Sequence, residues 1–260
     1  MTFLELHRPG DPFVLANAWD LGSARLLAAM GAKAIATSSA GYAFTRGVAD
    51  TQIGRSEAIA HGRAVVEAVS VPVSADLEDG YGPTPEDCAT TVREAAEAGL
   101  AGCCIEDVSA AREAYGFDLA VDRMRAAVEA APPNFVFCAR TDGVMHGLYD
   151  LDEAIRRLQA FQAVGAHVLY CPFPGDPEDL RRLVGSVAAP VNALCSGPLA
   201  RLSLAEMGAM GVARVSLGGA LARAAQKVAM EAGAAALAGD FTQLGGPGAE
   251  IDALVAKGAG

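Results

Sequence analysis

The feature that most constrains this chain is an alternation, repeated eight times, between a short apolar run and a longer amphipathic segment. Short runs that are apolar on both faces are typical of parallel strands lying under helices, and the amphipathic segments predict those helices. The expected strands are 13–17, 34–37, 73–76, 101–106, 135–141, 167–171, 191–194 and 214–217. The expected helices are 21–30, 55–69, 85–98, 121–131, 151–163, 177–187, 204–210 and 221–238.

Eight such units predict a single α/β domain, a closed (β/α)8 barrel of the TIM type, whereas four would suit an open sheet. No Gly-x-Gly-x-x-Gly segment follows the first expected strand, which argues against a dinucleotide-binding sheet. Four expected helices end at a glycine that leads directly into a strand: Gly31, Gly99, Gly165 and Gly211. We expect the catalytic barrel over residues 1–240. The Gly/Ala-rich tail, 241–260, is expected to be frayed or docked on a partner subunit.

The chain is acidic, with 20 basic and 31 acidic residues and a formal net charge of −11. This balance argues against nucleic acid and anionic membranes as partners, but not against a small anionic substrate. No apolar run approaches the ~20 residues of a membrane span, and the N-terminus does not look like a signal peptide, so we expect a cytoplasmic protein. The six cysteines form no Cys-x-x-Cys pair and are expected to be reduced, buried hydrophobes.

Acidic residues gather at the ends of the third and fourth expected strands, where barrel enzymes carry their active sites. Asp76 and Glu78 point the same way in an extended segment, and Glu106 closes the neighbouring strand. Carboxylates at this density repel one another unless a cation lies among them, and hard oxygen ligands favour Mg²⁺, or alternatively Mn²⁺, over zinc. The sequence therefore predicts a divalent-metal site. The alternative is an ordinary acidic loop, which we consider a reasonable interpretation for Asp79.

Arg140 closes the fifth expected strand and must find an anion. It could brace the carboxylates or grip a substrate carboxylate bidentately, and we favour the substrate. Asp142 is expected to have a structural role. The small residues Ser38, Ser39 and Ala40 follow the second strand and would expose backbone N–H groups to an anion, with a simple tight turn as the alternative.

The histidines form no cluster in the sequence. Only His146, in the loop after the fifth strand, is a candidate for a place near the site, with a place away from it favoured, while His7 and His61 are expected to be peripheral. A Gly218-Gly219 pair after the last strand could hold a phosphate, but close packing explains two glycines equally well.

Several segments together resemble the isocitrate lyase/phosphoenolpyruvate mutase superfamily, roughly from Asn17 to Ala225. They are Asn17-Ala18-Trp19-Asp20, Ser23-Ala24-Arg25, Thr37-Ser38-Ser39, Asp76-Leu77-Glu78-Asp79-Gly80-Tyr81-Gly82, Ile105-Glu106-Asp107, Ala139-Arg140-Thr141-Asp142 and Gly211-Val212-Ala213-Arg214-Val215-Ser216-Leu217-Gly218. The specificity lies in their order and spacing. The resemblance implies a homo-oligomer, a homodimer or homotetramer, often with the last helix exchanged between subunits.

The resemblance also implies roles for individual residues. Asp76 looks like the direct Mg²⁺ ligand, with Glu78, Glu106 and Asp50 reaching the ion largely through water. Residues 38–40 look like the cradle of a substrate carboxylate that Arg140 grips. Such enzymes act on 2-oxo acids, or on acids that yield them, through a metal-stabilised enolate as a C–C or C–P bond breaks. The candidate catalytic residues are Arg140, Asp50, Glu106 and Arg112, and Tyr42 and Asn192 are candidates for shaping the substrate pocket.

Two departures from the family affect the expected reaction. The lid loop, residues 107–117, lacks the Lys-Lys-Cys-Gly-His segment of isocitrate and 2-methylisocitrate lyases, and no histidine follows the sixth strand as in the mutases. Arg112 is either a substitute cationic lid residue or a solvated arginine. We expect a Mg²⁺-dependent C–C lyase for a 2-oxo acid or a substituted malate or isocitrate-like acid. The alternatives are an oxaloacetate hydrolase or decarboxylase, P–C bond chemistry on a phosphonopyruvate-like substrate, and a non-catalytic 2-oxo acid binder.

Overall fold

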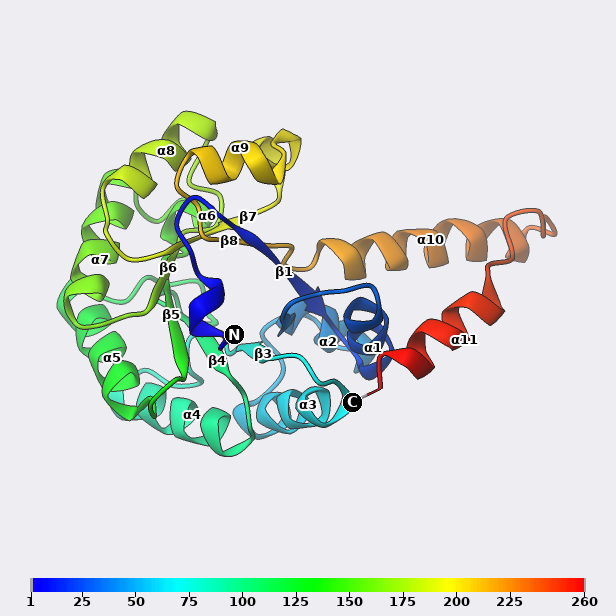
Figure 1. Ribbon diagram of the computed structural model, residues 1–260, viewed down its shortest axis with the longest axis horizontal. Helices are drawn as coiled ribbons and strands as arrows, with labels where there is room; N and C mark the ends of the chain where they lie inside the picture. Colours follow the sequence, from blue (N-terminus) through cyan, green and yellow to red (C-terminus); the bar gives the residue numbers. More distant parts are fainter. Residues whose placement is uncertain (1, 260) are drawn as a thin grey trace.

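The computed structural model describes residues 2–259 and contains a closed barrel of eight parallel strands arranged in chain order (Figure 1). The strands are β1 (Phe13–Ala18), β2 (Ile35–Thr37), β3 (Val73–Asp76), β4 (Gly102–Glu106), β5 (Val136–Arg140), β6 (Val168–Tyr170), β7 (Val191–Leu194) and β8 (Arg214–Ser216). β8 closes the barrel on β1, with Phe13 opposite Arg214. The expected (β/α)8 barrel is confirmed, and each expected strand is present within one or two residues.

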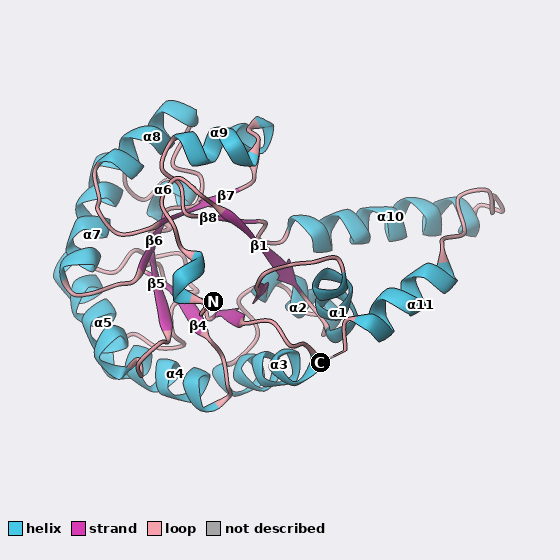
Figure 2. Cartoon of the chain, in the orientation of Figure 1, coloured by secondary structure: helices cyan, strands magenta, loops and turns pink. Residues whose placement is uncertain are grey.

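Helices surround the strands (Figure 2). Those that match expected segments are α1 (Leu21–Ala29), α3 (Arg55–Ala68), α4 (Pro85–Glu97), α5 (Phe117–Ala130), α7 (Leu151–Ala163), α8 (Pro177–Gly185), α9 (Leu204–Ala209) and α10 (Ala220–Leu237). The sequence did not predict α2 (Ser39–Thr45), α6 (Gly143–His146), α11 (Gly248–Lys257) or the 3₁₀ turns η1 (Leu4–Leu6) and η2 (Gly197–Arg201). All four expected cap glycines adopt left-handed φ, as at Gly99 with φ 85°.

Apolar side chains fill both faces of the barrel wall. Phe137 and Ile105 pack outward against Met124 and Leu158 of the surrounding helices, and all four are fully buried. Inside, the N-terminal end of the barrel is closed by Phe3, Phe13 and His7, whose rings meet edge to face. His7 thus lies at the opposite end of the barrel from the acidic strand ends, but η1 folds it under the barrel, where it is only 6% exposed.

The C-terminal helices leave the barrel. α10 extends away from it and α11 returns to pack against α1 (Figure 1). The only fully buried residue of α10 is Ala222, while Met230 and Leu237 are 74% and 94% exposed. The tail thus contains a helix that its Gly/Ala-rich composition did not reveal. Within the described residues, no helix is both long enough and apolar enough to cross a membrane.

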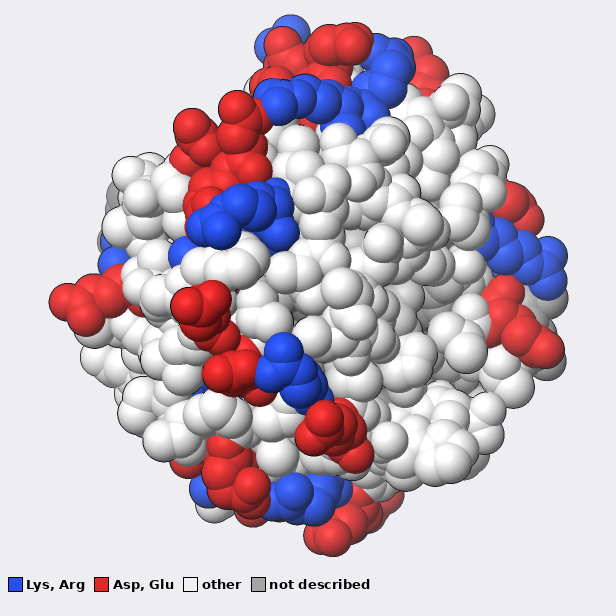
Figure 3. All heavy atoms as spheres, turned by 90° about the vertical axis from the view of Figure 1, so that its left-hand side faces the viewer, with Lys and Arg blue, Asp and Glu red and all other residues white. Residues whose placement is uncertain are grey.

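The outer helices α5, α7 and α8 carry charges of both signs. Figure 3 shows basic and acidic side chains side by side on this face. Neighbouring residues form exposed ion pairs, including Arg156–Glu153 on α7 and Arg181–Glu178 on α8. The charges on this face are interspersed and do not form a continuous basic field.

Candidate active site

A pocket of about 280 Å³ opens at the carboxyl end of the barrel strands. Most of the candidate residues from the sequence line it together: Ser38, Ser39, Ala40, Asp50, Asp76, Glu78, Glu106, Arg112 and Arg140. His146 also lines it, although the sequence favoured a place away from the site. Residues that the sequence did not single out complete the wall, notably Met145, Leu194 and Arg223. Loops after six different strands build this pocket, so only the closed barrel brings its residues together.

Arg140 lies at the centre of the charges in this pocket. Its Nε and Nη2 donate to the two carboxylate oxygens of Asp142. Its Nη1 lies 3.1 Å from Glu106 Oε2 and 3.6 Å from Asp76 Oδ1. Burial alone would lower the pKa of Arg140, but the carboxylates of Asp142 and Glu106 outweigh it and hold that pKa well above its ordinary value. Of the two roles considered for Arg140, the structure shows the bracing of carboxylates; gripping of a substrate stays a prediction.

Asp76 is held by residues that follow β2. The Ser39 hydroxyl donates to Asp76 Oδ2 at 2.9 Å, and the Asp76 backbone N–H donates to Thr37 Oγ1 at 3.0 Å. Ser38 is the N-cap of α2, where its side chain accepts from the Gly41 N–H. Residues 38–40 are therefore the start of a helix rather than the simple tight turn considered from the sequence. The first N–H groups of a helix lack intrahelical partners, which suits an anion.

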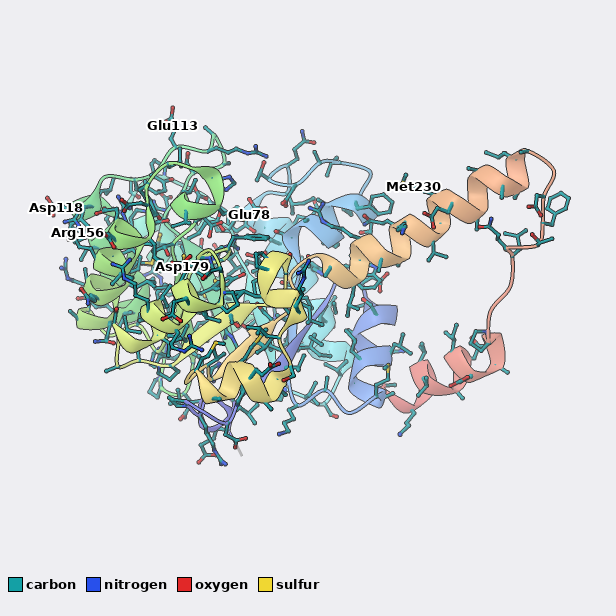
Figure 4. The ribbon with its side chains drawn as sticks, turned by 90° about the horizontal axis from the view of Figure 1, so that it is seen from above. Glu78, Glu113, Asp118, Arg156, Asp179 and Met230 are labelled. Carbon is teal, nitrogen blue, oxygen red and sulfur yellow. The ribbon has the colours of Figure 1, made fainter. Side chains whose placement is uncertain are left out.

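Glu78 reaches the same pocket as Asp76, but not for the reason expected from strand alternation. β3 ends at Asp76, and Glu78 has a left-handed backbone with φ 47°. A turn therefore directs its side chain, which Figure 4 shows over the body of the barrel. Burial, with the nearby charge of Asp76, raises the pKa of Glu78 to about 8. Burial also raises the pKa of Glu106 well above its ordinary value.

Asp79 turns away from this group, in keeping with a structural role. Its carboxylate accepts from the Tyr115 hydroxyl at 2.7 Å and from the Tyr81 backbone N–H. Arg123, fully buried on α5, donates to the carbonyl oxygens of Asp79 and Gly82 and stacks on the Tyr115 ring. These contacts tie the loops after β3 and β4 together beside the pocket.

The carboxylates of the pocket can be compared with the ligands that a divalent cation requires. Residues 2–259 contain no group of three or more His, Cys, Asp or Glu side chains placed to enclose a metal ion. A cage made only of protein ligands is therefore not what this site offers. Mg²⁺ usually keeps several waters and takes one or two carboxylates. Asp76, with Glu78 and Glu106 as raised-pKa carboxylates nearby, fits such a water-rich site, because a cation would relieve their mutual repulsion.

Two predicted pocket residues lie outside its lining. Tyr42 lies behind the wall, stacked on His61 with ring centroids 3.8 Å apart, and its hydroxyl donates to Glu57. Asn192 lies deeper in the barrel, where its amide bonds Ser216 and Arg214. The prediction that His61 is peripheral was wrong, since it is only 9% exposed and its Nε2 has no partner among the described residues. A lone histidine on an amphipathic helix carries no sequence signal of this burial.

His61 should contribute to the acid sensitivity of folding. Burial lowers its pKa to about 4 from 6.5, so the folded state binds this proton less readily than the unfolded state. Stability is then lost as the pH falls below 6.5 and towards 4, by roughly 2 kcal/mol at pH 5. We expect His61→Phe, which keeps the stack on Tyr42, to reduce the fall in unfolding free energy between pH 7 and pH 5 by that amount in urea titrations.

A second variant separates charge from packing. His61→Gln also cannot titrate in this range but loses the ring, so it should show the same reduced pH dependence at lower overall stability. If both variants keep the wild-type difference between pH 7 and pH 5, His61 is not a source of the acid sensitivity.

The barrel and the acidic strand ends define a class of barrel enzymes whose active sites lie at this end of the fold. The model of the phosphoenolpyruvate phosphomutase family matches residues 3–238, and the chain belongs to this family, within the isocitrate lyase/phosphoenolpyruvate mutase superfamily of lyases and mutases. A solved Burkholderia cenocepacia structure, provisionally assigned as a lyase or mutase, is 44% identical with a TM-score of 0.91 and covers 97% of this chain and 93% of its own.

Two further comparisons bear on the family. The 2-methylisocitrate lyase of Escherichia coli is 31% identical over 211 residues, which are 73% of this chain and 71% of that protein. A phosphonopyruvate hydrolase, solved in complex with oxalate and Mg²⁺, shares the fold at 24% identity with a TM-score of 0.83, covering 97% and 94% of the two chains. The superfamily resemblance read from the sequence motifs is confirmed.

Proposed function

We propose that this protein is a Mg²⁺-dependent lyase that cleaves a C–C bond in a 2-oxo acid or a substituted malate or isocitrate-like acid. The observation that carries the proposal is the meeting of Arg140 with Asp76 and Glu106 on the floor of a pocket of about 280 Å³. An arginine and an acidic metal site in one small pocket can orient an acid that has two negatively charged groups. The Escherichia coli relative, named for its action on 2-methylisocitrate, supports the same substrate class.

Different residues of the chain would bind the substrate and the cation. The N–H groups at the start of α2, residues 38–40, would hold a substrate carboxylate. Arg140 would offer its Nη1 to a second oxygen of the substrate, while Asp142 fixes the guanidinium plane through Nε and Nη2. Asp76, Glu78, Glu106 and Asp50 would hold Mg²⁺, partly through water. When bound, the cation would supply positive charge next to the substrate oxygen that becomes negative as the C–C bond breaks.

The loop after β4 bears on which bond breaks. Arg112, with a left-handed φ of 61°, lines the pocket from this loop, whereas the neighbouring Glu113 projects away from the body of the protein in Figure 4. We propose that Arg112 is the cationic residue contributed by the lid. Its guanidinium is a permanent charge and a poor proton donor at neutral pH, so its role would be electrostatic.

The test is a substrate panel with and without Mg²⁺: branched malates, 2-methylisocitrate, oxaloacetate and phosphonopyruvate. We expect release of a 2-oxo acid from a malate or isocitrate-like member, measured by chromatography. Oxalate from oxaloacetate would instead identify a hydrolase, and a changed phosphorus NMR spectrum with phosphonopyruvate would identify P–C chemistry. Calorimetric binding of pyruvate with Mg²⁺, but no turnover of any compound, would leave a non-catalytic binder and contradict the proposal.

We also propose that the cytoplasmic enzyme is a homo-oligomer in which α10 packs on a second copy of the chain. α10 is exposed along most of its length, and Figure 4 shows Met230 on the part that projects from the barrel. Its apolar residues Val228 and Met230 are 63% and 74% exposed, and Leu237 is 94% exposed. Apolar surface gathered on one projecting helix is unusual for a monomer.

We expect Met230→Glu combined with Leu237→Glu to lower the molar mass measured by light scattering at micromolar concentration. The reason is that both charges would have to be buried in the interface. Lys227→Glu, on an exposed and already polar position of the same helix, is the matched control and should keep the wild-type mass. A wild-type chain that is monomeric throughout would overturn the proposal.

A further inference from the structure

A second polar cluster lies inside the barrel, beneath the pocket. Its centre is Arg214 at the start of β8, only 3% exposed. Its Nε donates to Asn192 Oδ1 at 2.8 Å, its Nη1 meets His7 Nε2 at 3.2 Å, and its Nη2 donates to Cys138 Sγ at 3.1 Å. None of these three contacts is a carboxylate, although a guanidinium stays charged at any physiological pH.

The charge of Arg214 points to a thiolate. A buried charge is costly unless it is paired, and Asn192 is neutral. His7 is neutral as well, because burial lowers its pKa to about 3, and its Nδ1–H donates to the Phe3 carbonyl, which leaves Nε2 to accept from Arg214. Cys138 is therefore the one contact that can become an anion. Burial alone would raise its pKa, but the neighbouring Cys104 thiol and the charge of Arg214, whose Nη2 donates to its sulfur, bring the pKa of Cys138 to about 7.

Cys104 is placed to pair with Cys138. The two residues are direct partners in the register of the parallel strands β4 and β5, and each thiol shifts the pKa of the other. Neighbouring strands lie about 4.8 Å apart, which is within the Cα–Cα range of disulfides, about 4.4–6.8 Å. Cys103 belongs instead to the cluster that faces the outer helices, so the adjacent cysteine is on the opposite side of the wall.

A cavity leads from the pocket floor to Cys104, and Cys138 is not among its lining residues. It has a volume of about 60 Å³ and is lined by Cys104, Arg214, Asp76 and Arg140, among others. Cys104 is half-buried, whereas Cys138 is buried behind it. A water molecule occupies about 30 Å³ in the liquid, so the space admits a molecule the size of hydrogen peroxide but not a disulfide reagent such as oxidised glutathione.

We propose that Cys104 and Cys138 form a redox-active dithiol beneath the active site, which hydrogen peroxide converts to a disulfide. The thiolate of the pair attacks one peroxide oxygen, the O–O bond breaks, and the leaving hydroxide takes up a proton to become water. The resulting sulfenic acid is attacked by the second thiol; the S–S bond forms, the S–O bond breaks, and a second water leaves. Two thiols and one peroxide thus give one disulfide and two waters.

The position of the pair makes its oxidation state relevant to the pocket. Cys104 is the register partner of Asp76 on β3, and Cys138 lies two residues before Arg140 on β5. A 2.05 Å bond between the two sulfur atoms would fix β4 to β5 directly below both charged groups. Oxidation of the pair is measured as a linked peptide and not as turnover, so its test does not depend on the proposed reaction.

The experiment exposes the fully reduced, full-length protein to hydrogen peroxide near pH 7 and maps cysteines by mass spectrometry after alkylation and non-reducing digestion. Cys195, which is half-buried and outside the cluster, is the internal control. We expect the peptide that links Cys104 to Cys138 to form at least about tenfold faster than Cys195 is oxidised, and dithiothreitol, added after unfolding, to remove it. Oxidation of Cys195 while both barrel cysteines stay alkylatable after unfolding would overturn the proposal.

Two variants test the mechanism of activation. Arg214→Gln should slow formation of the linked peptide by at least about tenfold, while Arg214→Lys, which keeps a cation, should slow it less. Cys104→Ser should leave Cys138 as a sulfenic acid that dimedone traps when it is added together with denaturant after the peroxide has been removed. If Arg214→Gln does not fold, the Cys104→Ser trapping and the wild-type map decide the matter, since absence of both the adduct and the linked peptide rejects the dithiol.

Discussion

Asp76→Asn is expected to lower turnover of the substrate found in the panel by at least about 100-fold, or roughly 2.7 kcal/mol of transition-state stabilisation. The amide has the size of the carboxylate but carries no charge, so the Ser39 hydrogen bond at 2.9 Å can persist while the cation loses its proposed direct ligand. Arg140, at 3.6 Å, also loses one of its anionic neighbours. Steady-state kinetics at saturating Mg²⁺ measures the effect as a change in kcat/KM.

The same variant has a readout that needs no substrate. Mg²⁺ at 100 times its dissociation constant should stabilise the wild type by about 2.7 kcal/mol, which is a rise in Tm of several degrees for a chain of this size. Asp76→Asn should lose this rise. Asp118→Asn, an exposed carboxylate on α5, is the matched control and should keep both the rise and the turnover. An equal rise in Tm for all three proteins would show that the ion binds elsewhere.

The sequence was sufficient for the barrel because the barrel depends on local patterns. Each strand is a short apolar run, and a glycine such as Gly99, with φ 85°, ends a helix in a way that the sequence displays. Elements without an apolar period were missed. α2 begins Ser39-Ala40-Gly41, and α11 lies in a Gly/Ala-rich tail, so both look like turn or linker in the sequence and are stabilised by tertiary packing.

The candidate site was predictable only in part, for a related reason. Asp76, Glu106 and Arg140 lie at strand ends, and barrel closure alone brings strand ends together. The contacts that support them cross between elements far apart in sequence. Arg123 and Arg157 lie on amphipathic helices, where an arginine that reaches a neighbouring loop has the same sequence pattern as one that is solvated. Tyr42 and Asn192 were identified by their place in the chain, but side-chain direction, which the pattern does not define, turns them away from the pocket.

Arg157→Met is expected to destabilise the protein by about 3–5 kcal/mol, because it leaves a buried carboxylate without its cation. Arg157 Nη1 lies 2.9 Å from Asp107 Oδ2 and also donates to the Tyr115 carbonyl, while its Nε donates to Glu153. Asp107 is fully buried and accepts as well from Tyr149 and from the backbone N–H of Asp142. Since Asp142 holds Arg140, the variant should also lower turnover while the protein remains folded.

Equilibrium urea unfolding measures the loss, and two further variants determine its origin. Arg182→Met breaks an ion pair with Asp152 between α8 and α7 that is more than half exposed, and it should cost less than about 1 kcal/mol. Adding Asp107→Asn to Arg157→Met should recover part of the stability, since the unpaired charge is then gone and the amide can still accept from Tyr149. A loss for Arg157→Met as small as that for Arg182→Met would mean that water reaches Asp107 and that this network does not position Arg140.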